Sequence, residues 1–137
     1  MEVKEILKDI GSRISNIGAL VDTNPDNDPV EEYSDKTLKD IDKNDATEDV
    51  IENAYKQLDD IIYKYNNKGQ ALGEDDKLRA GVTAQSMQGS ILESNVFKDP
   101  ETGYLKVDTA QQTLANAAAI KTLFTKIDEL EKLIRKE

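Results

Sequence analysis

The sequence predicts an α+β fold in which small strands and helices precede a long C-terminal helix. Two observations support this class. Apolar residues recur at helical spacing over residues 120–134, after a run of small residues that suits a helix. Between residues 33 and 107, short runs rich in β-branched and aromatic residues alternate with polar turns and one helical pattern. Heptad spacing occurs at both ends of the chain, so we expect an intertwined homotrimer with coiled-coil helices.

The composition limits the kinds of partner and core that this chain can have. Its 137 residues include 18 Lys and Arg against 28 Asp and Glu, for a formal net charge of -10. Such a chain repels nucleic acid, which is bound by basic surfaces. Hydrophobic residues make up 37% and aromatic residues 5%, which is lean for a monomer because burial must offset conformational entropy. We therefore expect the subunits to share a core.

Missing residue types exclude several chemistries. The chain has no Cys and no His, which excludes disulfides, thiolate zinc sites, imidazole-bound metals and Ser-His-Asp catalysis. We expect no metal and no cofactor, and a nucleophile would have to be Ser or Thr with Lys or a carboxylate as base.

No run approaches 18 apolar residues and no apolar signal-peptide core follows Met1, so we expect a soluble chain with no membrane partner.

Residues 1–21 form the first predicted unit, a coiled-coil-like helix. Its apolar stripe has spacings of 4, 3, 4, 3 and 4 and consists of Val3, Leu7, Ile10, Ile14, Ile17 and Val21. β-Branched residues at both seam positions favour three or more strands over two. The alternative is an ordinary amphipathic helix packed on its own domain, and Gly11 and Gly18 lower the helix propensity.

Residues 22–33 form the second unit, an acidic linker. Two prolines and several Asn and Asp residues make it rich in turns. Its alternating acids resemble the opening of a calcium loop, but Asn27 stands where glycine is required and Tyr33 where the bidentate Glu should be. A charged, solvated linker is the preferred interpretation, and a calcium-dependent adhesion module is an alternative.

Residues 34–137 form the third unit, with several short elements followed by the long helix. We expect strands at Thr37–Ile41, Ile61–Tyr65, Gly81–Gln85 and Gly103–Val107, the third leading into a short helix. A helix from Thr47 to about Asp60 has Thr47 as its cap; a turn at 66–69 and a loop at 69–79 follow the second strand. Asp108 or Thr109 caps the last helix. The seam of that helix is Ile120, Leu123, Ile127, Leu130 and Ile134.

A Ser–Lys pair is the one nucleophile and base arrangement that this composition leaves to test. A lysine in water has a pKa of about 10.4, so a lysine base needs burial away from carboxylates to act near neutral pH. Ser and Lys are both common in this chain. Composition alone therefore selects no pair.

One stretch, Ser34-Asp35-Lys36-Thr37-Leu38-Lys39, does select a pair by resemblance. It resembles the opening motif of the endosialidase-type intramolecular chaperones, the self-cleaving C-terminal domains of phage tailspikes, tail fibres and neck appendages. Further segments resemble that family in the same order: Ala54–Leu58, Tyr63–Tyr65, Gly81–Gln85, Gly103–Asp108 and Ala119–Lys121. The resemblance covers residues 34–137. It departs from the family at Thr37, where Arg is frequent, and at Ser86, where Glu is frequent.

The resemblance implies a trimeric chaperone domain that assists folding of an upstream fibre or appendage domain and then releases itself. It implies that Ser34 is the nucleophile, Lys39 the base, Tyr33–Ser34 the scissile bond and Asp35 part of the supporting motif. The partners implied are two further copies and the upstream domain, with no nucleic acid. The location implied is a virion fibre or appendage precursor assembled in the host cytoplasm, from which the chaperone domain is released.

Backbone geometry adds a condition to this interpretation. An offset of five residues points to opposite faces on a strand and about 140° apart on a helix. The Asp35–Leu38 segment must therefore bend, or Lys39 must come from a neighbouring subunit. The alternatives for these residues are a simple turn at Ser34-Asp35 and a solvated Lys39. In that case the chain is a non-catalytic trimerisation or attachment module of a virion fibre.

Overall fold

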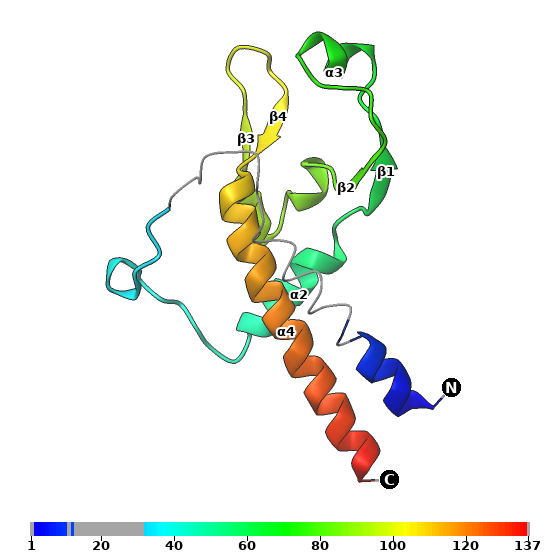
Figure 1. Ribbon diagram of the computed structural model, residues 1–137. Helices are drawn as coiled ribbons and strands as arrows, with labels where there is room; N and C mark the ends of the chain where they lie inside the picture. The colour runs from blue at the N-terminus through cyan, green and yellow to red at the C-terminus, as the bar shows by residue number, and fades with distance from the viewer. Residues whose placement is uncertain (1, 11, 13–31, 137) are drawn as a thin grey trace.

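The structure is a computed structural model that describes residues 2–10, 12 and 32–136. It combines helices with small antiparallel strand pairs and ends in a long C-terminal helix (Figure 1), which confirms the predicted α+β class in this respect. The second half of the predicted N-terminal stripe and the linker as far as residue 31 lie outside the described residues. No helix within the described ranges is long and apolar enough to cross a membrane.

The elements are short except for the last. The helices are α2 (Thr47–Lys56), α3 (Asn67–Ala71) and α4 (Thr109–Arg135), and residues 3–10 are also helical. Three 3-10 turns are η1 (Lys36–Leu38), η2 (Gln85–Met87) and η3 (Ile91–Asn95). The strands β1 (Ile61–Tyr63) and β2 (Arg79–Gly81) form one antiparallel pair, and β3 (Val96–Lys98) and β4 (Leu105–Val107) form another.

A small apolar core lies where α2, η2 and η3 meet α4. Its fully buried members are Ala54 of α2, Met87 of η2 and Leu92 of η3. Partly buried side chains surround it, namely Tyr55, Leu58, Val96, Val107 and Ala115. Both strand pairs extend from this core at the end opposite the chain termini (Figure 1). Within the described residues this core has three fully buried apolar side chains.

The N-terminal helix lies beside the C-terminal half of α4 (Figure 1). Leu7 is buried on this helix, whereas Val3 and Ile10 of the same predicted stripe are exposed. On α4, Ile127 is 8% exposed, but its seam neighbours Leu123 and Leu130 are 47% and 48% exposed. Among the described residues, a single chain therefore buries one member of each stripe and leaves two of its neighbours in that stripe exposed.

The cap of α4 is one of the two residues that the sequence offered. The Asp108 carboxylate accepts a hydrogen bond of 3.1 Å from the Gln111 N–H, so Asp108 and not Thr109 is the cap. This bond satisfies one of the free N–H groups in the first turn.

The predicted helix over Thr47 to about Asp60 begins at the expected residue, but its predicted cap and its predicted end are wrong. Ala46 occupies the cap position, and the hydroxyl of Thr47 instead accepts from the Asn44 N–H. At the other end α2 stops at Lys56. The Gln57 side chain donates there to the carbonyls of Ser86 and Gln88, at 3.0 and 2.6 Å. These bonds join the C-cap residue of α2 to η2 and to the residue after it.

Three further predictions need correction. The expected strand at Thr37–Ile41 does not form, because this segment contains the 3-10 turn η1. The expected turn at 66–69 belongs to α3, whose first turn is capped by the Asn66 side chain. The expected strand at Gly81–Gln85 ends where it was predicted to begin, since β2 is Arg79–Gly81, although the short helix after it is present as η2. The sequence interpretation also missed β3 and η3.

Candidate functional site

The predicted catalytic residues lie on an extended segment, residues 32–46, which we call the arm. Every residue of the arm is exposed. In Figure 1 the arm is drawn in cyan and stands apart from the helices of the core. The candidate site is therefore built by local contacts within the arm.

The arm contains one short 3-10 helix, the turn η1. The Asp35 carboxylate accepts hydrogen bonds from the backbone N–H of Thr37 at 2.9 Å and from the Thr37 hydroxyl at 2.8 Å. The Leu38 N–H donates to the Asp35 carbonyl at 3.0 Å, which closes the turn. The N–H and then the hydroxyl of Thr37 stabilise the carboxylate, so the pKa of Asp35 lies below its usual value.

This bend brings the two predicted catalytic side chains together within one chain. The Lys39 Nζ donates a hydrogen bond of 2.9 Å to the Ser34 Oγ. The sequence allowed either a bent segment or a lysine from a neighbouring subunit, and the described chain has the bent segment. Tyr33, which precedes Ser34 across the predicted scissile bond, is 91% exposed.

The distance between these two atoms suits proton transfer. General bases act within about 2.6–3.2 Å of the proton-bearing atom, and the separation of Ser34 Oγ and Lys39 Nζ lies in this range. A neutral amine in this position would accept the hydroxyl proton along the same line. The carbonyl of Tyr33 directly precedes Ser34 in the chain. The arrangement is thus suited to attack on the bond before Ser34.

Two polar clusters outside the arm were not predicted. In the first, the Asp59 carboxylate accepts from the N–H and the hydroxyl of Thr83, at 2.8 and 2.7 Å. These bonds, with a smaller contribution from Ser86, lower the pKa of Asp59. Ser86, which replaces the frequent Glu of the resembled family, donates its hydroxyl to the Thr83 carbonyl. No local sequence signal reveals this cluster, because Asp59 and Thr83 are 24 residues apart in the chain.

The second cluster joins α2, η3 and α4. The Tyr55 hydroxyl, the Gln112 amide, the Asn116 amide and the Asn95 amide are linked by hydrogen bonds of 2.7–3.1 Å. Desolvation of the half-buried ring raises the pKa of Tyr55 to about 12, partly opposed by the bond from Gln112. The cluster contains no Ser or Lys. Its chemistry is therefore that of a packed polar contact.

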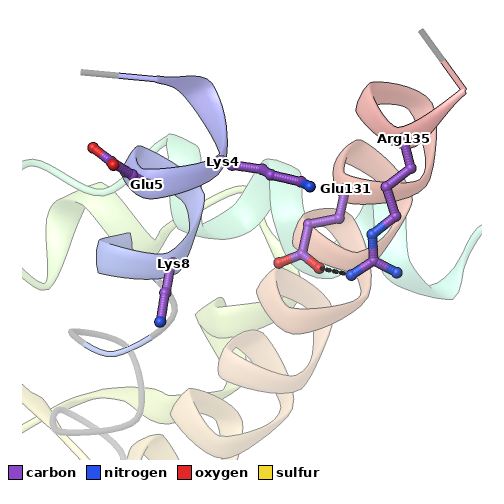
Figure 2. A pocket seen from close by; sticks show the side chains of 5 residues that line it. All are labelled: Lys4, Glu5, Lys8, Glu131 and Arg135. Carbon is purple, nitrogen blue, oxygen red and sulfur yellow. Dashed lines mark ion pairs between the residues drawn. The ribbon is translucent and has the colours of Figure 1, made fainter.

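A pocket of about 250 Å³ lies between the N-terminal helix and the end of α4 (Figure 2). It is lined by Lys4, Glu5, Lys8, Glu131 and Arg135. Arg135 is paired with Glu131 at 3.6 Å, one turn apart on α4. This lining holds no hydroxyl nucleophile, and neither Ser34 nor Lys39 belongs to it. The pocket therefore adds nothing to the predicted hydrolytic chemistry.

Metal binding has no support in the described ranges, where no group of three or more acidic residues could hold an ion. Most of the possible calcium loop, residues 22–31, lies outside those ranges.

Comparison of the chain with protein-family models, curated proteins and solved structures finds no match.

Proposed function

We propose that this chain is an intramolecular chaperone that trimerises, assists folding of an upstream fibre or appendage domain and then cleaves itself before Ser34. The observation that carries the proposal is the 2.9 Å hydrogen bond between Lys39 Nζ and Ser34 Oγ. It joins the two side chains that the motif resemblance selected, at a separation suited to proton transfer. The cleavage is a single turnover on the protein's own chain, by a Ser–Lys dyad.

The proposed reaction proceeds in two steps. Lys39, as a neutral amine, takes the hydroxyl proton while Ser34 Oγ attacks the Tyr33 carbonyl carbon. The bond between that carbon and the Ser34 nitrogen breaks, and the nitrogen takes up the proton from Lys39. The product is an ester between the Tyr33 acyl group and Ser34 Oγ. Water then hydrolyses the ester, which leaves a carboxylate on Tyr33, a free amine on Ser34 and the original hydroxyl.

Exposure of the arm supports a requirement for assembly. A lysine becomes a neutral base more readily when it is shielded from water, and both Ser34 and Lys39 are exposed in the single chain. The arm also carries three large apolar side chains without cover: Tyr33, Leu38 and Ile41 are 91%, 66% and 58% exposed. Burial of these side chains against neighbouring copies would shield the dyad at the same time. Cleavage would then follow trimerisation, as a folding checkpoint requires.

Denaturing mass spectrometry of the purified protein tests the cleavage. We expect a fragment that begins at Ser34, together with the complementary piece that ends at Tyr33. Denaturation is needed because the N-terminal helix lies beside α4 and can hold the upstream piece in place after cleavage. Ser34→Ala and Lys39→Ala should each leave the chain intact.

Lys36→Ala is the matched control, because Lys36 is a neighbouring exposed lysine of the same turn that makes no contact with Ser34 among the described side-chain bonds. This variant should be cleaved like the wild type. A new amino terminus at position 34 in the Ser34→Ala protein would overturn the proposed nucleophile. Full cleavage of Lys39→Ala would overturn the proposed base.

A second candidate function is a non-catalytic trimerisation or attachment module. It is favoured by the exposure of the whole arm, since a solvated Ser34–Lys39 contact can be an ordinary surface hydrogen bond. An assembled, fully folded wild-type trimer that stays intact over days would select this function. The same sample would then exclude autoproteolysis.

A further inference from the structure

We propose that Asp35 is a positioning residue that holds Lys39 against Ser34 through the turn η1. The catalytic consequence rests on the proposed function, whereas the positioning itself does not. Asp35 touches neither reacting atom. It acts through the backbone that carries Lys39.

The geometry of the turn assigns this role. Ser34 and Lys39 can meet only if the four residues between them fold back, because an extended chain would place them on opposite faces. A 3-10 turn has poorer hydrogen-bond geometry than an α-helix, so a side-chain hydrogen bond adds to its stability. In η1 the backbone supplies the bond from Leu38 N–H to the Asp35 carbonyl and the bond from Lys39 N–H to the Lys36 carbonyl. The two remaining bonds both end on the Asp35 carboxylate.

No packing from the core supports the turn within the described chain, since all residues of the arm are exposed. The carboxylate is therefore the main side-chain contribution to the bend. It also satisfies the Thr37 N–H, one of the free donors at the start of the turn. The Thr37 hydroxyl donates to the same oxygen, Oδ1. Removal of this acceptor should widen the separation between Lys39 Nζ and Ser34 Oγ.

Asparagine separates the acceptor role from the charge. Asn is as good a cap as Asp because its side-chain oxygen accepts the same bond. We expect Asp35→Ala to slow the appearance of the Ser34 amino terminus by about fivefold, the factor for loss of one cap, and Asp35→Asn to restore most of the rate. Thr37→Val, which keeps the backbone N–H and removes the hydroxyl, should give a smaller decrease.

A second measurement does not depend on cleavage. The chain has no cysteine, so a Ser34→Cys variant carries one thiol at the site. A nearby lysine ammonium stabilises the thiolate and speeds alkylation. We expect iodoacetamide to label Ser34→Cys at pH 7 about threefold faster than Ser34→Cys/Lys39→Met, because tenfold more thiolate is partly offset by its lower nucleophilicity.

The labelling rates of two Asp35 variants, compared with the rates of Ser34→Cys and Ser34→Cys/Lys39→Met, decide the inference. Ser34→Cys/Asp35→Asn should be labelled as fast as Ser34→Cys, and Ser34→Cys/Asp35→Ala as slowly as the Lys39→Met variant. Both Asp35 variants remove the same charge, so a difference between them reports the lost acceptor. Equal labelling of the two would overturn the proposal, even if the wild type cleaves. Unequal labelling in a protein that never cleaves would support the positioning and reject the proposed function.

Discussion

The Tyr55 hydroxyl of α2 donates a hydrogen bond of 2.7 Å to the Asn116 side chain of α4, across 61 residues of sequence. The Gln112 amide donates to both of these groups, at 3.1 and 2.9 Å, and accepts a bond of 2.9 Å from Asn95. This network ties the first core helix to the long helix beside the apolar core. Among the described buried side chains, no polar atom is left without a hydrogen-bond partner.

The raised pKa of Tyr55 leads to the prediction that the fold is less stable at alkaline pH. Burial raises its pKa from 10.0 to about 12 in the folded chain. Between these two values the unfolded chain has lost the phenol proton while the folded chain keeps it, so the free energy of unfolding falls as pH rises. Chemical denaturation at pH 9 to 12 measures this slope, and Tyr55→Phe should make it shallower.

Tyr55→Phe should also lower the free energy of unfolding at pH 7 by about 1 kcal/mol, the usual net value of one hydrogen bond. The effect stays small because Asn116 keeps its bond from Gln112. The matched control is Tyr104→Phe, on an exposed ring beside β4. Equal losses in the two variants at pH 7 would contradict the assigned role of the network.

The lowered pKa of Asp59 leads to the prediction that the fold loses stability at acid pH. Hydrogen bonds from the Thr83 N–H and hydroxyl, and then from Ser86, hold its pKa below the ordinary 3.8. A group with a lowered folded pKa stabilises the fold above its unfolded value, and this contribution is lost as pH falls through the folded value. We expect Asp59→Asn to reduce the loss of stability between pH 5 and pH 2, measured by thermal melting. Asp60→Asn, at the exposed neighbouring carboxylate, is the control and should keep the wild-type profile.

Elements with a strong local signal were predictable from the sequence. The sequence narrowed the cap of α4 to Asp108 or Thr109, and the small and apolar residues that follow predicted a helix to the end of the chain. Strands β1 and β4 lie within the segments that were rich in β-branched and aromatic residues. The contacts at the end of α2 were not predictable, since the side chain of Gln57 donates to carbonyls about 30 residues further along the chain.

The two residues of the candidate site were predictable from the sequence, but the backbone conformation between them was not. The resemblance selected Ser34 and Lys39, and the offset of five required a bend. The bend itself was mistaken for a strand, because Thr37, Leu38 and Ile41 have high strand or apolar character. Its actual cause is the Asp35 side chain, which competes with extended pairing by capping its own neighbours.

The exposed leucines of α4 predict where the contact of the proposed trimer lies. Leu123 and Leu130 are about half exposed, whereas Ile127 between them is buried in the single chain. Leu130→Asp should abolish the trimer, because it would place three charges in an apolar seam. Analytical ultracentrifugation of this variant should give the mass of one chain, with cleavage lost. Ile127→Ala should instead lower the free energy of unfolding of the chain, by about 2–5 kcal/mol, because it leaves a cavity at a buried position. A stable trimer of Leu130→Asp would contradict the predicted seam.

Chemical reconstruction of the base gives the sharpest test of Lys39. Because the chain has no cysteine, Lys39→Cys introduces a unique thiol, and this variant should purify uncleaved. Bromoethylamine then adds an aminoethyl group to the sulfur, which restores an amine at the same number of bonds from the backbone. We expect this treatment to start cleavage before Ser34, as seen by denaturing mass spectrometry over time.

Two controls make the result specific to a base at position 39. Iodoacetamide adds a neutral amide of similar size to the same thiol, and the product should remain intact because an amide cannot take up the Ser34 proton. Lys36→Cys combined with Lys39→Ala, treated with bromoethylamine, places the new amine on the neighbouring residue of the turn and should also remain intact. Cleavage in either control would show that the amine need not reach Ser34 Oγ, and the 2.9 Å contact would then be incidental to the reaction.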